Sequence, residues 1–166
     1  MQWTSFRMIS ALLFVASMLG MAFALYLEHV QGLDPCPLCV FQRVGLIGLG
    51  LISFIALLHN PVSQGGKRGY AFLGLISILW STAVAGRHVW LQHLPADQVP
   101  SCGPGLDYLL DALPLKTVLQ QVLSGSGECA AIDWTFLGQS LPVWSLLLFS
   151  ILTLISVWQL FRKYPA

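Results

Sequence analysis

The sequence predicts an all-α integral membrane protein: a four-helix transmembrane bundle with one large loop outside the membrane. Two observations lead to this fold class. The chain is 56% hydrophobic and only 9% charged, whereas globular proteins carry about 25% charged residues. Four apolar runs approach the ~20 residues that a helix needs to cross a bilayer. We expect a single domain over residues 1–166, with spans at 8–27, 38–58, 69–88 and 142–161.

The first span, 8–27, is the uncharged stretch between Arg7 and Glu28. A cleaved signal peptide is the alternative, because Ala22-Phe23-Ala24 resembles a cleavage site. The apolar run continues past that point to Leu27, which favours a retained helix. A short loop, 28–36, follows.

The second span, 38–58, begins at Pro35-Cys36-Pro37-Leu38-Cys39. Proline suits the first helical position, so Cys36 is expected near the N-cap and Cys39 in the first turn. Unpaired amides and the positive helix end stabilise a thiolate there. Arg43 lies four residues after Cys39, on the same helix face, and its charge would lower the thiol pKa further. The pattern predicts a redox site at a membrane surface.

The third span, 69–88, follows a hairpin over 59–68 and ends near Arg87 and Trp90. The loop 89–141 comes next. Its leucines from Leu106 to Leu113 follow helical i, i+3, i+4, i+7 spacing, which predicts a short amphipathic helix lying in the lipid interface. A helix packed on the end of the bundle is the alternative. The fourth span, 142–161, completes the fold.

The basic residues predict the orientation. Four spans place both termini and the 59–68 hairpin on one side of the membrane. That side has five of the eight Lys and Arg residues, and the other side has all seven acidic residues. The positive-inside rule makes the termini cytoplasmic. The four cysteines then lie outside the cytoplasm, where disulfides persist. The sequence contains no basic cluster of the kind that binds nucleic acid.

Four cysteines, Cys36, Cys39, Cys102 and Cys129, allow three disulfide connectivities. Proximity in sequence favours Cys36–Cys39 and Cys102–Cys129. Cys102 lies in a strip rich in proline and glycine that suits presentation of its sulfur to another protein, although a purely structural bridge remains an alternative. Zinc usually needs four ligands, and the chain has one Cys-x-x-Cys; a c-type haem would need histidine at Val40.

A reactive pair of this kind needs an electron acceptor. Structural disulfides lie below about −300 mV and a strongly oxidising thiol carrier near about −120 mV, a deficit of roughly 8 kcal/mol for two electrons. The cysteines must therefore be strained or electrostatically tuned. No Rossmann or flavin motif appears in the sequence. The acceptor within reach of Cys39 and Arg43 is a membrane-soluble quinone.

The chain resembles the bacterial inner-membrane disulfide bond formation protein B (DsbB) family over nearly its whole length. The resemblance rests on the Pro-Cys-Pro-Leu-Cys segment with Arg43, Gly86-Arg87-His88 before Leu91-Gln92, the lone Cys102, Ser126-Gly127-Glu128-Cys129, Trp134, and Phe136-Leu137-Gly138.

The resemblance implies a thiol–quinone oxidoreductase that reoxidises a DsbA-like periplasmic thiol oxidase. Cys102 would accept the partner's thiolate, Cys129 would then attack Cys36, and Cys39 would face ubiquinone or menaquinone. Arg43 would stabilise the Cys39 thiolate, and His88 would belong to the quinone site. For His88, an interface histidine bonded to the backbone is the alternative.

Three other functions remain open at the level of sequence. A sister enzyme of the same fold would serve one dedicated thiol partner. A non-enzymatic membrane protein would use its four cysteines as structural bridges. A vitamin K epoxide reductase-like enzyme would share the chemistry, but it usually places its Cys-x-x-Cys late in the bundle.

Overall fold

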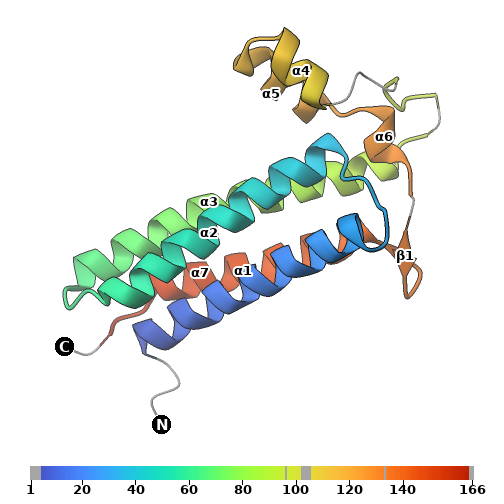
Figure 1. The fold of residues 1–166 in the computed structure, drawn as a ribbon. Coiled ribbons are helices and arrows are strands. Elements are labelled where there is room, and N and C mark those ends of the chain that lie inside the picture. The colour runs from blue at the N-terminus through green and yellow to red at the C-terminus, as the bar shows by residue number, and fades with distance from the viewer. Residues whose placement is uncertain (1–4, 96, 102–105, 133, 165–166) are drawn as a thin grey trace.

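The structure is a computed structural model that describes residues 5–95, 97–101, 106–132 and 134–164. Four long helices form a bundle (Figure 1): α1 (Phe6–His29), α2 (Pro37–His59), α3 (Gln64–Gln92) and α7 (Leu141–Phe161). Each is long and apolar enough to cross a membrane. Their outer faces expose large apolar side chains, as lipid-facing helices do. The predicted multi-pass helical fold is confirmed.

The helices pack in chain order. α1 lies against α2, α2 against α3, and α3 against α7, whereas α1 and α7 barely touch. Both ends of the chain lie at one end of the bundle, and the remaining short elements lie at the other (Figure 1). We call the latter the cysteine end, because α2 begins there with Cys36 as its N-cap.

The helices extend beyond the expected spans, most of all α3. It begins at Gln64, although residues up to 68 were expected to form a hairpin loop. The Ser63 side chain caps the helix by accepting a hydrogen bond from the Gly66 amide at 3.1 Å. A Cβ at Gly66 would lie 2.9 Å from Pro61, so this tight helix start needs glycine. At its other end α3 continues past His88 to Gln92.

Small residues bring α2 and α3 close together. A Cβ at Gly45 would lie 2.5 Å from the carbonyl oxygen of Ser77. The hydroxyl of Ser77 donates to the Gly45 carbonyl at 2.9 Å, and the hydroxyl of Ser81 donates to the Gln42 carbonyl at 2.7 Å. Close approach through glycine and serine is typical of membrane helix pairs. These contacts fix the register of α2 against α3, and so of Cys39 against His88.

The large loop contains more structure than one helix. It forms α4 (Leu106–Ala112), α5 (Leu115–Ser124), α6 (Gly127–Ala130) and a two-stranded antiparallel hairpin, β1 (Thr135–Phe136) and β2 (Gln139–Ser140). Sequence analysis did not foresee the hairpin. Its turn residues Leu137 and Gly138 have φ of 51° and 77°, the backbone that a tight two-residue turn between strands requires.

Part of the apolar stripe of the loop packs on the bundle, as the alternative to the lipid-interface prediction expects, whereas Leu110 remains 51% exposed. Leu109, Val118 and Val122 are buried together with Leu38 of α2 and Leu91 of α3. The alternative of a helix packed on the bundle end is therefore right for these residues.

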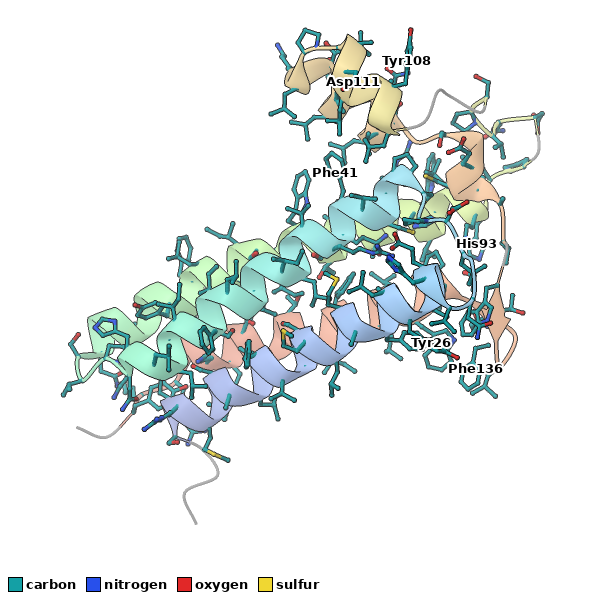
Figure 2. All side chains as sticks on the ribbon, in the orientation of Figure 1. Tyr26, Phe41, His93, Tyr108, Asp111 and Phe136 are labelled. Carbon is teal, nitrogen blue, oxygen red and sulfur yellow. The ribbon has the colours of Figure 1, made fainter. Side chains whose placement is uncertain are left out.

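The opposite side of α4 and α5 remains exposed. Tyr108 is 63% exposed and points away from the bundle (Figure 2).

Arg87 of α3 holds the end of α5, because its Nε and Nη2 donate to the carbonyls of Leu123 and Ser124 at 3.2 and 2.8 Å. A cation at a helix C-terminus also suits the helix dipole. The loop helices are thus tied to the bundle by both apolar and polar contacts.

Candidate active site

The cysteine pair occupies the start of α2, as the sequence predicted. Cys36 is the N-cap, Pro37 fills the first helical position, and Cys39 lies in the first turn. The two Sγ atoms are 3.1 Å apart, with the Cys36 thiol donating to Cys39. Both cysteines are free. A disulfide needs about 2.05 Å, so a small movement of either side chain would close the bond.

His88 of α3 lies beside both sulfurs. Its Nε2 is 3.8 Å from Cys36 Sγ and its Nδ1 is 3.9 Å from Cys39 Sγ. The ring is only 3% exposed, and its Nδ1 contacts the side-chain amide of Gln42 at 3.2 Å. The structure thus brings His88 to the cysteine pair through side-chain contacts. The other three histidines, His29, His59 and His93, are exposed.

Arg43 has a partner that the sequence did not reveal. Its Nη1 forms an ion pair with Glu28 at the end of α1, and its Nη2 donates to the Ala24 carbonyl at 3.4 Å. The two charged side chains are only 20% and 27% exposed. A guanidinium has five N–H donors, so these contacts leave donors for a ligand. The ion pair anchors the guanidinium between α1 and α2.

A cavity of about 260 Å³ opens between α1, α2 and α7, where α1 and α7 barely touch. Cys36, Cys39, Arg43 and His88 all line it. The rest of its wall is mainly apolar or aromatic and includes Phe23, Leu27, Leu46, Trp134, Trp144, Leu148 and Phe149. Four of the six predicted site residues therefore share one apolar cavity at the cysteine end.

Cys129 lies next to this cavity, in α6. It is 1% exposed and belongs to the apolar cluster against which Cys36 packs. The neighbouring Cys36 sulfur, together with burial, raises the pKa of the Cys129 thiol. The Ser126 hydroxyl lies 3.6 Å from the Cys129 Sγ. Cys129 thus lies beside Cys36, the first member of the pair.

Cys102 lies outside the described residues, and so its predicted role is not tested by any contact. The residue before it, Ser101, accepts a hydrogen bond through its carbonyl from the Gly127 amide at 3.4 Å. Ser101 therefore contacts the start of α6, the helix that contains Cys129.

Two site residues were missed by sequence analysis, Gln42 and Glu28. Gln42 is a polar residue that is 5% exposed on an apolar helix; its position three residues after Cys39 was a usable signal. Glu28 was seen only as the end of the first span. Its pairing with Arg43 joins residues fifteen positions apart, for which the local sequence offers no signal.

Cys36, Cys39 and His88 also form a potential set of metal ligands. One ligand atom from each residue lies within 4.8 Å of the others. The argument from sequence against zinc considered only the cysteines, and the structure adds an imidazole to them.

The fold and the site define the class as a multi-pass helical membrane protein with a cysteine pair at the start of a span, facing an apolar cavity. Comparison with known proteins agrees. The family model described as "Disulfide bond formation protein DsbB" matches residues 6–159.

Similar proteins named "Disulfide bond formation protein B" come from several bacteria. The Acinetobacter baumannii protein is 73% identical over 161 residues, which cover 97% of this chain and 94% of the relative. The Acinetobacter baylyi protein is 72% identical, covering 99% and 96% of the two chains. A Psychrobacter protein is 52% identical, covering 98% and 97%. The chain belongs to the DsbB family of disulfide bond formation proteins.

Proposed function

We propose that this protein is a thiol–quinone oxidoreductase of the bacterial inner membrane. It would reoxidise a DsbA-like periplasmic dithiol oxidase and pass the electrons to ubiquinone or menaquinone in the membrane. The observation that carries the proposal is the shared cavity: both sulfurs of the Cys36–Cys39 pair, Arg43 and His88 face one apolar space that lies between spanning helices. The cysteine end would face the periplasm and the termini the cytoplasm.

The residues of the cavity fit a quinone. Its apolar and aromatic wall suits a flat ring, and the guanidinium of Arg43 and the side chains of Gln42 and His88 offer polar groups for two carbonyl oxygens. A bound quinone supplies an acceptor for two electrons and two protons. Arg43 would hold positive charge near the Cys39 thiolate and the acceptor, and Glu28 would hold Arg43 in place.

The cysteines would relay electrons by thiol–disulfide exchange. A partner thiolate attacks Cys102 of a Cys102–Cys129 disulfide and releases Cys129. The Cys129 thiolate attacks Cys36, breaks the Cys36–Cys39 bond and frees Cys39. The partner's second thiolate breaks the mixed disulfide and leaves as the partner's disulfide, which frees the Cys102 thiolate. Cys102 attacks Cys129 in the Cys129–Cys36 disulfide and releases Cys36. Cys36 and Cys39 then form their disulfide again, and their two electrons would pass to the quinone. The packing of Cys129 against Cys36 supports the middle step.

Once Cys129 is ionised, its environment favours the forward direction of this exchange, although the raised pKa keeps the thiolate fraction small near neutral pH. A thiol of higher pKa is the stronger nucleophile as a thiolate, and a thiol of lower pKa leaves more readily. Burial, which acts whether or not Cys36 is in a disulfide, contributes to the raised pKa of Cys129. Cys39, at the positive end of α2, suits the role of leaving group.

A reconstituted system tests this function. The purified protein, a reduced DsbA-like dithiol and a short-chain ubiquinone are mixed, and the partner's thiols and the quinone absorbance are followed together. We expect one quinone to be consumed per partner disulfide formed. Thiol loss without quinone consumption, or at the same rate when quinone is omitted, would refute the proposal.

A further inference from the structure

The two sulfurs of the cysteine pair and the imidazole of His88 are spaced nearly as the ligands of a metal site. A tetrahedral zinc centre has Zn–S distances of about 2.3 Å and Zn–N of about 2.0–2.1 Å, which place two sulfurs about 3.8 Å apart and sulfur and nitrogen about 3.5 Å apart. The two sulfurs are 3.1 Å apart, Cys36 Sγ lies 3.8 Å from His88 Nε2, and Cys39 Sγ lies 3.9 Å from the other ring nitrogen, Nδ1. One ligand atom from each of the three residues lies within 4.8 Å of the other two. Small side-chain rotations would bring all three ligand atoms into range.

Gln42 can orient the histidine for this role. A histidine that binds a metal through one nitrogen usually donates its other N–H to a neighbouring acceptor. The amide of Gln42 contacts His88 Nδ1 at 3.2 Å. In the structure the amide nitrogen of Gln42 faces Nδ1. Rotation of the amide by 180° would bring its oxygen to accept from Nδ1–H, which fixes the tautomer that leaves the lone pair of Nε2, the nitrogen nearest Cys36, free for a metal.

The cavity provides the remaining requirements for binding. Cys36, Cys39 and His88 all line it, so that a cation and a water molecule as fourth ligand have space. Two carboxylates, Asp34 and Glu128, line the same wall. The guanidinium of Arg43 is the opposing charge, and it is already paired with Glu28. The local charges therefore favour a cation.

We propose that the reduced protein binds one thiophilic divalent cation, such as Zn²⁺ or Cd²⁺, through Cys36, Cys39 and His88. Binding forms two metal–thiolate bonds. Each S–H bond still present breaks and releases one proton, and no electron is transferred. The disulfide form has no thiolates to offer and does not bind. The metal therefore locks the pair in its reduced state.

The consequence for activity depends on the proposed function, whereas the binding does not. Thiolates held by the metal no longer supply electrons to a quinone, so that Zn²⁺ inhibits quinone reduction by the reduced protein. A binding assay that contains neither quinone nor thiol partner tests the site alone, and its result stands whether or not the protein reduces quinones.

The experiment uses the full-length protein in detergent with Cys102→Ser and Cys129→Ser, so that two cysteines remain. The protein is reduced, freed of reductant without oxygen and titrated with Cd²⁺, while thiolate-to-metal charge-transfer absorbance and proton release are recorded. We expect saturation at one equivalent with release of one proton for each of the two thiols that is protonated at the assay pH, and no signal after oxidation of the pair. An equal signal from the oxidised protein, or none from the reduced protein, would overturn the proposal.

Histidine variants separate the three-ligand site from a bare dithiol. Loss of a hydrogen-bond partner of a ligand alone weakens metal binding about 10-fold or more, so that His88→Gln is expected to weaken Cd²⁺ binding by at least about tenfold. The matched control is His93→Gln, at the exposed histidine that follows the last residue of α3 (Figure 2), which leaves the affinity unchanged. Wild-type affinity in His88→Gln would exclude histidine as a ligand.

X-ray absorption on the zinc-loaded protein gives a second reading that does not depend on folding of the His88 variant. We expect two sulfur ligands and one imidazole in the first coordination shell. A shell without imidazole scattering would contradict the assignment of His88.

Discussion

Removal of the Arg43 guanidinium separates the two half-reactions of the proposed cycle. In Arg43→Ala, the cation between α1 and α2 disappears and Glu28 keeps its charge without the partner that it has in the structure. Charged hydrogen bonds are worth about 1.5–3 kcal/mol, which corresponds to a roughly 10- to 100-fold slower step. We expect this loss in quinone reduction, because Arg43 lines the cavity, and little change in exchange at Cys102.

The same substitution costs stability for a different reason. A fully buried ion pair loses about 3–5 kcal/mol when one partner is removed, and an exposed pair about 0–1 kcal/mol. With side chains 20% and 27% exposed, the Arg43–Glu28 pair lies between these limits, and we expect a loss of about 1–2 kcal/mol. The double variant Arg43→Ala/Glu28→Gln removes the unpaired carboxylate and is expected to recover most of that stability.

Stopped-flow measurement of quinone absorbance and of partner thiol oxidation distinguishes the two effects. We expect the double variant to regain stability while quinone reduction remains slow. Equal slowing of both half-reactions in Arg43→Ala would refute the role given to Arg43. Recovery of quinone reduction in the double variant would show that the arginine acts only through its structural pair.

Three further predictions concern packing, titration and the loop. Gly45→Ala places a Cβ against the Ser77 carbonyl and is expected to lower stability by about 1–3 kcal/mol, measured by thermal unfolding in detergent. The control is Gly65→Ala, whose added Cβ meets open space. Equal losses of stability in the two variants would contradict the close α2–α3 contact. Because the pKa of Cys129 is raised, its alkylation in the reduced protein is expected to keep accelerating with pH beyond about 8.5, the ordinary thiol pKa; a plateau there, measured by peptide mass spectrometry, would contradict the burial argument. Arg87→Ala removes two hydrogen bonds to the end of α5 and is expected to speed amide hydrogen exchange in α5 but not in α7; unchanged exchange in α5 would show that apolar packing alone holds it.

Local rules account for what the sequence predicted correctly. Apolar runs with at most one charge, Arg43 in the second, located four helices, because a lipid-facing helix carries few charged residues over its length. Pro37 at the first helical position placed Cys36 and Cys39 within the first turn, because proline's fixed φ suits that position. Both inferences need only a few adjacent residues, and the structure agrees with them.

The features that sequence analysis missed depend on contacts between distant segments. Gln42 touches His88 across α2 and α3, and Glu28 meets Arg43 only because α1 and α2 run side by side. From its spacing alone, the stripe around Leu109 was expected to lie in the lipid interface. Spacing shows which residues share a helix face, but it does not show what covers that face. The start of α3 was missed because the Gly65-Gly66 pair resembles a turn, whereas the Ser63 cap makes it helical.

A single-turnover experiment tests the central proposal most directly. The fully reduced protein is mixed with one equivalent of short-chain ubiquinone, and quinone absorbance and the disulfides formed are measured on the same sample. We expect one quinone to be reduced as the Cys36–Cys39 disulfide appears, and none to be reduced by Cys39→Ser. Undiminished quinone reduction by Cys39→Ser would contradict the role of this sulfur as the donor in the cavity.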